Sequence, residues 1–100
     1  MNRAEAKAVL GSQVRELKKH SYSEFRSWIV ERRIETPLVK GTSGTEYQVE
    51  AEALWDSEPS GDIRVLVSVD DGGLLSSFLP LADSFLISPD GSLPHFVVSE

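Results

Sequence analysis

The middle of the chain alternates between apolar and polar residues with few exceptions, and this pattern limits what the chain can fold into. Within residues 45–55 every second residue from Tyr47 onward is apolar, and the same holds from 63 to 69. A period of two predicts strands with one packed and one solvated face, as in antiparallel sheets. Turn-forming residues at 56–61 join the two stretches into a hairpin. Its packed face is expected to contain Tyr47, Val49, Ala51, Ala53, Trp55, Ile63, Val65, Val67 and Val69.

Strand and turn signals on either side extend this hairpin. Residues 34–40 predict a first strand, and Pro37 confines it to a sheet edge or a bulge because proline cannot donate a backbone hydrogen bond. The Gly-Thr-Ser-Gly run at 41–44 predicts a hairpin loop. The Asp-Asp-Gly-Gly run at 70–73 predicts a tight turn before a fourth strand at 74–79.

The N-terminal third has the period of an α-helix instead. The apolar residues between 3 and 19 fall on one stripe, and Ser21 with Glu24 forms a capping-box pattern, although Ser23 is a rival cap. A second helix is therefore expected to run to about Glu31. Its aromatic face is typical of core packing rather than of a ligand site. The two apolar stripes consist of Ala6, Val9, Leu10, Val14 and Leu17, and of Tyr22, Phe25, Trp28 and Ile29.

These patterns predict an α+β fold with one or two N-terminal helices packed on one face of a four-stranded antiparallel β-meander. A chain of 100 residues can bury one modest core but not two. We therefore expect a single domain over 1–100, helical at 3–31, with the meander at 34–80. The tail at 81–100 is expected to be irregular, although short strands can form in it, and Ser-Pro-Asp-Gly at 88–91 predicts a β-turn.

The charges are distributed unevenly along the chain. Residues 1–40 contain nine Lys/Arg and five Asp/Glu, whereas residues 41–100 contain one and eleven. The net charges of +4 and −10 account for the total of −6. The charge distribution disfavours nucleic acid as a partner, because an acidic sheet beside a basic helical segment repels phosphate. Two interpretations stay open, namely ordinary solvated surfaces and a bipolar molecule that attracts a charged partner or a second copy.

Composition also limits the location and the chemistry. The chain has no cysteine, which excludes disulfides and thiolate metal sites. No apolar run approaches the roughly 20 residues of a membrane span, and the first apolar stretch is too short and polar for a secretion signal. We therefore expect a cytoplasmic protein without a membrane partner. No motif indicates a cofactor.

Several short motifs resemble a family of short bacterial proteins of about this length. They are Gly44-Thr45-x-Tyr47-Gln48-Val49-Glu50, Trp55-Asp56, Gly61-Asp62-Ile63-Arg64-Val65, Asp70-Asp71-Gly72-Gly73 and Ser88-Pro89-Asp90-Gly91-Ser92. The similarity spans roughly residues 20–92. It implies a bacterial, single-domain, stand-alone protein, and it carries over no catalytic or binding residue.

Leu54 and Leu66 break the alternation, since they fall on the side of the strands where polar residues are expected. Scattered exposed leucines are normal, but a cluster of them marks an interface. The leading hypothesis is therefore a non-enzymatic protein-binding module. It would bind another protein, or a second copy of itself, through the outer sheet face or a sheet edge.

The alternative is a small metal-dependent or acid–base hydrolase that uses turn aspartates. Asp70 and Asp71, with Asp56, Asp62 or Asp90 from other turns, could gather oxygen ligands for Ca²⁺ or Mg²⁺. Aspartate and glycine are also what tight turns require, and the spacing matches no EF-hand loop. The sequence therefore offers these carboxylates as candidate metal ligands and assigns no catalytic residue.

Overall fold

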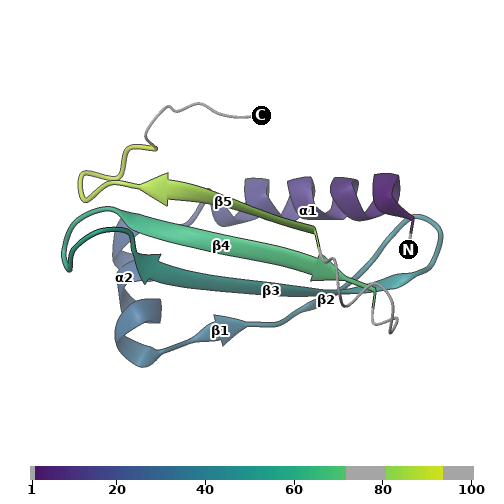
Figure 1. Cartoon of the computed structure of the whole chain (residues 1–100), viewed down its shortest axis with the longest axis horizontal. Helices are drawn as coiled ribbons and strands as arrows, with labels where there is room; N and C mark the ends of the chain where they lie inside the picture. The colour runs from purple at the N-terminus through teal and green to yellow at the C-terminus, as the bar shows by residue number, and fades with distance from the viewer. Residues whose placement is uncertain (1, 72–80, 94–100) are drawn as a thin grey trace.

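Two helices lie against one face of an antiparallel sheet in the computed structural model, which describes residues 2–71 and 81–93 (Figure 1). The predicted α+β fold, with its N-terminal helices on one sheet face, is confirmed. Within residues 2–71 and 81–93 the sheet has five strands, whereas the sequence predicted four. In chain order the elements are α1 (Arg3–Leu17), α2 (Tyr22–Glu31), β1 (Ile34–Glu35), β2 (Leu38–Lys40), β3 (Glu46–Trp55), β4 (Ile63–Asp70) and β5 (Leu81–Ile87).

Both helices begin at side-chain caps, which supply acceptors for backbone N–H groups that have no partner in the first turn. In α1 the Asn2 side chain accepts a hydrogen bond from the Glu5 backbone N–H at 3.0 Å. In α2 the predicted capping box is present: Glu24 N–H donates to Ser21 Oγ at 3.1 Å, and Ser21 N–H donates to Glu24 Oε1 at 2.7 Å. The first helix ends at Leu17, two residues before the predicted end.

The long strand β3 lies at the centre of the sheet. It pairs with β4 on one side and with both β1 and β2 on the other, all antiparallel. Pro37 separates β1 from β2 at this edge, as expected from its missing N–H, and its carbonyl accepts a hydrogen bond from Val49 N–H at 3.0 Å. The predicted first strand is thus two short strands interrupted at Pro37.

The strand beside β4 lies in the segment for which the sequence predicts an irregular tail. β5 pairs with β4 along its whole length, from Leu81 opposite Val69 to Ile87 opposite Ile63. The fourth strand predicted at 74–79 lies outside the described residues. The β-turn predicted at 88–91 is confirmed, because Gly91 N–H donates to Ser88 O at 2.8 Å with a Gly91 φ of 88°.

The core lies between the helices and the inner face of the sheet. The alternation of β3 and β4 places the predicted apolar side chains inward, and of that set only Trp55 is partly exposed. From the helices, Phe25 and Trp28 of α2 join the apolar stripe of α1 in this core. The rings of Phe25 and Trp28 meet edge to face with centroids 5.1 Å apart. With its inner face covered, the sheet offers its outer face for contact.

Candidate interaction surface

Leu54 and Leu66 lie on the outer face of the sheet, away from the helices. Leu54 pairs with Arg64 and Leu66 pairs with Glu52, so the two leucines are diagonal neighbours on adjacent strands. Diagonal neighbours of this kind are about 7–8 Å apart. Leu54 is 42% exposed and Leu66 is 37% exposed, so both side chains are accessible from solvent.

The short edge strands add two further exposed aliphatic side chains to this face. Ile34 of β1 is 47% exposed and pairs with Glu52, while Leu38 of β2 is 67% exposed and pairs with Gln48. We call Ile34, Leu54 and Leu66 the outer aliphatic patch, and Leu38 lies further along the same face. The sequence did not single out Ile34 and Leu38, because strands of two and three residues are too short to show an alternating pattern.

The outer face also carries several carboxylates, within the outer aliphatic patch and along the strands toward one end of the sheet. The outward-facing strand residues include four carboxylates and two cations, Lys40 and Arg64. Arg64 is already engaged: its Nε donates to Asp56 Oδ1 at 2.9 Å and its Nη1 to Ser84 Oγ at 3.0 Å. The outer face therefore combines the aliphatic patch with a net negative charge, and Glu52 lies between Ile34 and Leu66 in the register. The four carboxylates belong to Glu46, Glu50, Glu52 and Asp70.

A shallow hollow of about 260 Å³ opens on this face beside Leu66. We call it the outer hollow. Strands β3, β4 and β5 all contribute to it, so it depends on the register of the sheet rather than on any single segment. It is lined by Glu50, Glu52, Leu66, Val67, Ser68, Ala82 and Asp83.

The edges of the sheet are less suited to adding a strand from another protein. On one side β1 and β2 span two and three residues, and the intervening Pro37 has no N–H to donate. Short, interrupted edge strands are a known protection against edge-to-edge pairing. Among the described strands β5 forms the other margin, and the segments that precede and follow it lie partly outside the described residues.

The turn aspartates lie at two opposite ends of the sheet. Asp70 ends β4, whereas Asp56 and Asp62 flank the turn at the other end, where Asp56 N–H donates to Asp62 O at 2.9 Å. The eight residues of β4 separate these ends by about 25 Å at roughly 3.3 Å per residue. Within residues 2–71 and 81–93, no three His, Asp or Glu side chains gather in a way that could hold a metal ion. A metal site at Asp70 and Asp71 stays a prediction, since the next residues lie outside the described part.

A cluster that the sequence did not indicate surrounds the carboxylate of Glu5. This carboxylate accepts hydrogen bonds from Tyr47 Oη at 2.7 Å, from Ser43 N–H and Oγ at 2.7 and 2.8 Å, and from Thr42 Oγ1 at 3.1 Å. It therefore ties the first turn of α1 to the 41–44 loop. A Cβ at Gly41 would lie 2.6 Å from Glu5 Cδ, so this approach depends on glycine.

These contacts change the acidity of both partners. The hydrogen bond from Tyr47, followed by those from Ser43, lowers the pKa of Glu5 to about 2. The same bond from Tyr47, together with burial and the nearby charges of Glu5 and Asp71, raises the pKa of Tyr47 to about 12. Glu5 is thus held ionised and Tyr47 neutral near pH 7. This favours a structural role for their hydrogen bond over proton transfer.

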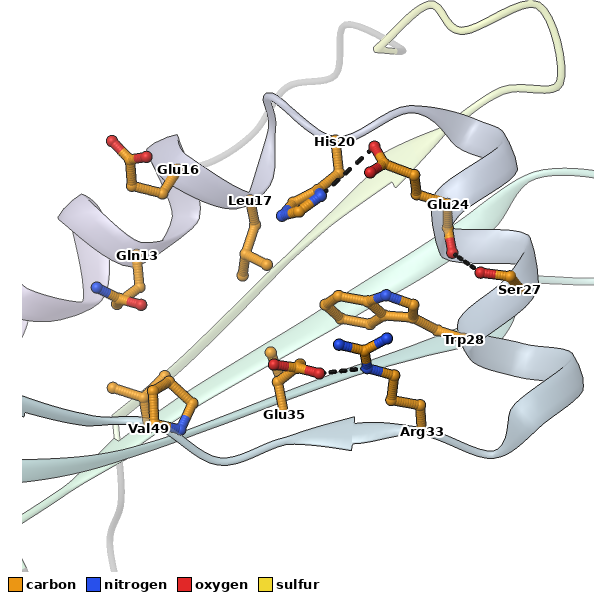
Figure 2. A pocket seen from close by; sticks show the side chains of 12 residues that line it. Gln13, Glu16, Leu17, His20, Glu24, Ser27, Trp28, Arg33, Glu35 and Val49 are labelled. Atoms are coloured by element: carbon orange, nitrogen blue, oxygen red, sulfur yellow. Dashed lines mark hydrogen bonds and ion pairs between the residues drawn. The ribbon is translucent and has the colours of Figure 1, made fainter.

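A second cleft, of about 380 Å³, opens on the helical side between α1, α2 and the β1 edge (Figure 2). The rings of Trp28 and His20 lie 5.8 Å apart in it, and the Arg33 guanidinium lies 5.7 Å from the Trp28 ring centre. Arg33 also donates a hydrogen bond to Glu35 (Figure 2). The cleft is lined by Gln13, Glu16, Leu17, His20, Glu24, Ser27, Trp28, Arg33, Glu35, Pro37, Val49 and Ala51.

The ionisable groups of this helical-side cleft are engaged with their neighbours. Glu16 pairs with Lys19 at 3.1 Å, and Glu24 lies 3.5 Å from His20 Nδ1. The Ser21 backbone N–H, with a smaller contribution from His20, lowers the pKa of Glu24. Ser27 Oγ donates to the Glu24 backbone carbonyl at 2.7 Å, so among the described residues of the cleft no serine faces a base. These contacts support helix capping and surface ion pairing.

Comparisons with protein-family models, with curated proteins and with solved structures found no match to this chain. The family resemblance suggested by its motifs therefore stays a prediction. Neither described helix combines the length and the apolarity needed to cross a membrane.

Proposed function

We propose that the protein is a non-enzymatic, cytoplasmic bacterial module that binds a different protein through the outer face of its sheet. The observation that carries this proposal is the outer aliphatic patch, in which Ile34, Leu54 and Leu66 are each more than a third exposed. Exposed aliphatic side chains that cluster on one face are typical of interaction sites. The polar surroundings of the patch resemble the rim of a protein interface.

The charge of the outer face favours a different protein over a second copy. Two copies placed face to face would bring one net negative surface against another, and like charges across an interface oppose association. The cations that could relieve this repulsion are Lys40 and Arg64, of which Arg64 is bound to Asp56. A partner surface that combines apolar and positive side chains would complement both the patch and the carboxylates of this face.

Affinity capture with matched variants tests this function. The immobilised protein is incubated with an extract of its native cells, and the retained proteins are compared with those retained by a Leu54→Ser, Leu66→Ser double variant. The matched control is Val30→Ser, which removes a 71% exposed aliphatic side chain from α2. We expect a protein that binds the wild type and the control but not the double variant, and that binds again directly when purified.

Two outcomes would count against the proposal. A partner retained equally by all three proteins would not use the outer face. Sedimentation that shows a dimer of the wild type, but a monomer of the double variant, would identify a second copy as the occupant instead. Circular dichroism of each variant excludes unfolding as the cause of any loss.

A further inference from the structure

The outer hollow combines aliphatic surface with carboxylates, Glu50 and Glu52 from β3 and Asp83 from β5. Leu66 and Ala82 supply aliphatic surface from β4 and β5. Glu52 stands directly opposite Leu66 in the β3–β4 register, and Glu50 stands opposite Ser68. Cross-strand partners have Cβ atoms about 4.5–5.5 Å apart, so both carboxylates can reach the mouth of the hollow.

These two carboxylates are uncommitted within the described part of the chain. Neither Glu50 nor Glu52 forms an ion pair or a side-chain hydrogen bond there, in contrast to Arg64, which is held by Asp56 and Ser84. They follow one another on the same side of β3, about 7 Å apart along the strand. A single cation placed between them would relieve their mutual repulsion and meet two acceptors.

The size of the hollow favours one side chain over a free small molecule. Its 260 Å³ lies below the roughly 300–1,000 Å³ of typical small-molecule pockets, and it is open rather than enclosed. A lysine side chain matches its chemistry, since the aliphatic stem covers apolar surface while the ammonium stays at the polar end. The compact ammonium has three donors that can be shared between two carboxylates.

We propose that the outer hollow accepts a lysine side chain of the partner protein, with its stem on Leu66 and Ala82 and its ammonium between Glu50 and Glu52. This inference rests on the proposed function and names the chemistry of the partner at one point of the same face. It makes lysine the determinant of partner choice, while the outer aliphatic patch supplies the general affinity.

A peptide titration followed by backbone amide NMR tests this assignment. The probe is acetyl-Ala-Leu-Lys-Leu-Ala-amide, compared with the same peptide carrying Nε-acetyllysine and with one carrying arginine. We expect shifts centred on Glu50, Glu52, Leu66 and Ala82 with the lysine peptide. We also expect about threefold weaker binding for each carboxylate removed in Glu50→Gln and Glu52→Gln.

Glu46→Gln is the matched control, because Glu46 is on the same face of β3 but outside the outer hollow. Several results would overturn the lysine assignment. In the peptide comparison they are equal binding of the lysine and acetyllysine peptides, or tighter binding of the arginine peptide. In the NMR titration they are shifts centred on other residues, or no shift at millimolar peptide, and among the variants an equal loss of binding in Glu46→Gln. High salt should weaken the binding of the lysine peptide and leave that of the acetyllysine peptide unchanged, because salt screens the charge attraction on which only the lysine peptide depends.

The two proposals can fail separately. A captured partner that is lost by the Leu54→Ser, Leu66→Ser variant but bound equally by Glu50→Gln, Glu52→Gln and wild type leaves the protein-binding function standing and overturns the lysine site. Capture unaffected by the leucine variant removes the proposed function itself, whatever the peptides do.

Discussion

The inner and outer faces of the sheet are made of the same strands but have opposite properties. On β4, Ile63, Val65, Val67 and Val69 face the helices and are at most 1% exposed. Between them, Arg64, Leu66 and Ser68 point to the other face and stay partly exposed. Because side chains alternate along a strand, the inward residues stabilise the fold, while the outward residues are available for contacts with other molecules. We expect a leucine on the outer face to be replaceable at small cost to folding, and its clustering with other exposed aliphatic side chains supports a contact surface.

The sharpest test of this division compares two residues of the same strand. Ile63→Ala should lower the free energy of unfolding by about 2–5 kcal/mol, because it opens a cavity in the core. Leu66→Ala should lower it by less than about 1 kcal/mol, because the side chain is already 37% exposed. Urea denaturation of both variants gives the two values. Similar losses would mean that the outer face is packed as the inner face is, and would remove the argument for a contact surface.

A smaller loss of stability is expected when the start of α2, which covers part of the inner face, is altered. Ser21→Ala removes the acceptor at the start of α2, and α2 carries Phe25 and Trp28 into the core. We expect a loss of about 1 kcal/mol, within the 0.5–2 kcal/mol usual for such caps, measured by urea denaturation. Ser23→Ala is the matched control at the rival cap position and should change stability by less than about 0.5 kcal/mol. The reverse order would place the helix start at Ser23.

The parts of the fold that the sequence predicted are those in which each segment carries its own pattern. Alternation indicated β3 and β4 and their buried side chains, and the capping pair indicated the start of α2. β5 was not predicted as a regular strand, because Asp83 and Ser84 interrupt its alternation and pairing with β4 determines its conformation. The sequence pattern thus predicts an element whose buried residues recur periodically. Where they do not, pairing with a neighbouring strand determines the secondary structure.

The candidate site was predictable to a smaller extent. Leu54 and Leu66 stood out because they violate a strong pattern. The outer hollow and Ile34 did not, because both depend on which residues the register brings side by side. The Glu5 cluster joins residues 37 to 42 positions apart. A single acidic residue in a helix gives no sign of such distant partners.

The Glu5 cluster should make the stability of the inner face depend on pH. It holds Tyr47 at one end of that face through a hydrogen bond between two ionisable groups. Folding lowers the pKa of Glu5 from 4.5 to about 2, so its ionised form is favoured in the folded state. Its stabilisation is therefore present above pH 4.5 and is lost as the pH falls toward 2. Tyr47 has the opposite sign: its pKa is raised from 10 to about 12, so its contribution is present below pH 10 and is lost as the pH rises toward 12.

Urea denaturation at a series of pH values should show both losses in the wild type. In Glu5→Gln the free energy of unfolding should fall less steeply between pH 4.5 and 2. In Tyr47→Phe the loss of stability between pH 10 and 12 should disappear, and the loss between pH 4.5 and 2 should be smaller. The acid slope should not vanish in Glu5→Gln, because hydrogen bonds from Ser21 and Ser92 also lower the pKa values of Glu24 and Asp90. A slope unchanged by Glu5→Gln would show that the carboxylate does not hold the 41–44 loop in solution. Because the cluster lies away from the outer aliphatic patch, neither variant should alter partner capture at neutral pH.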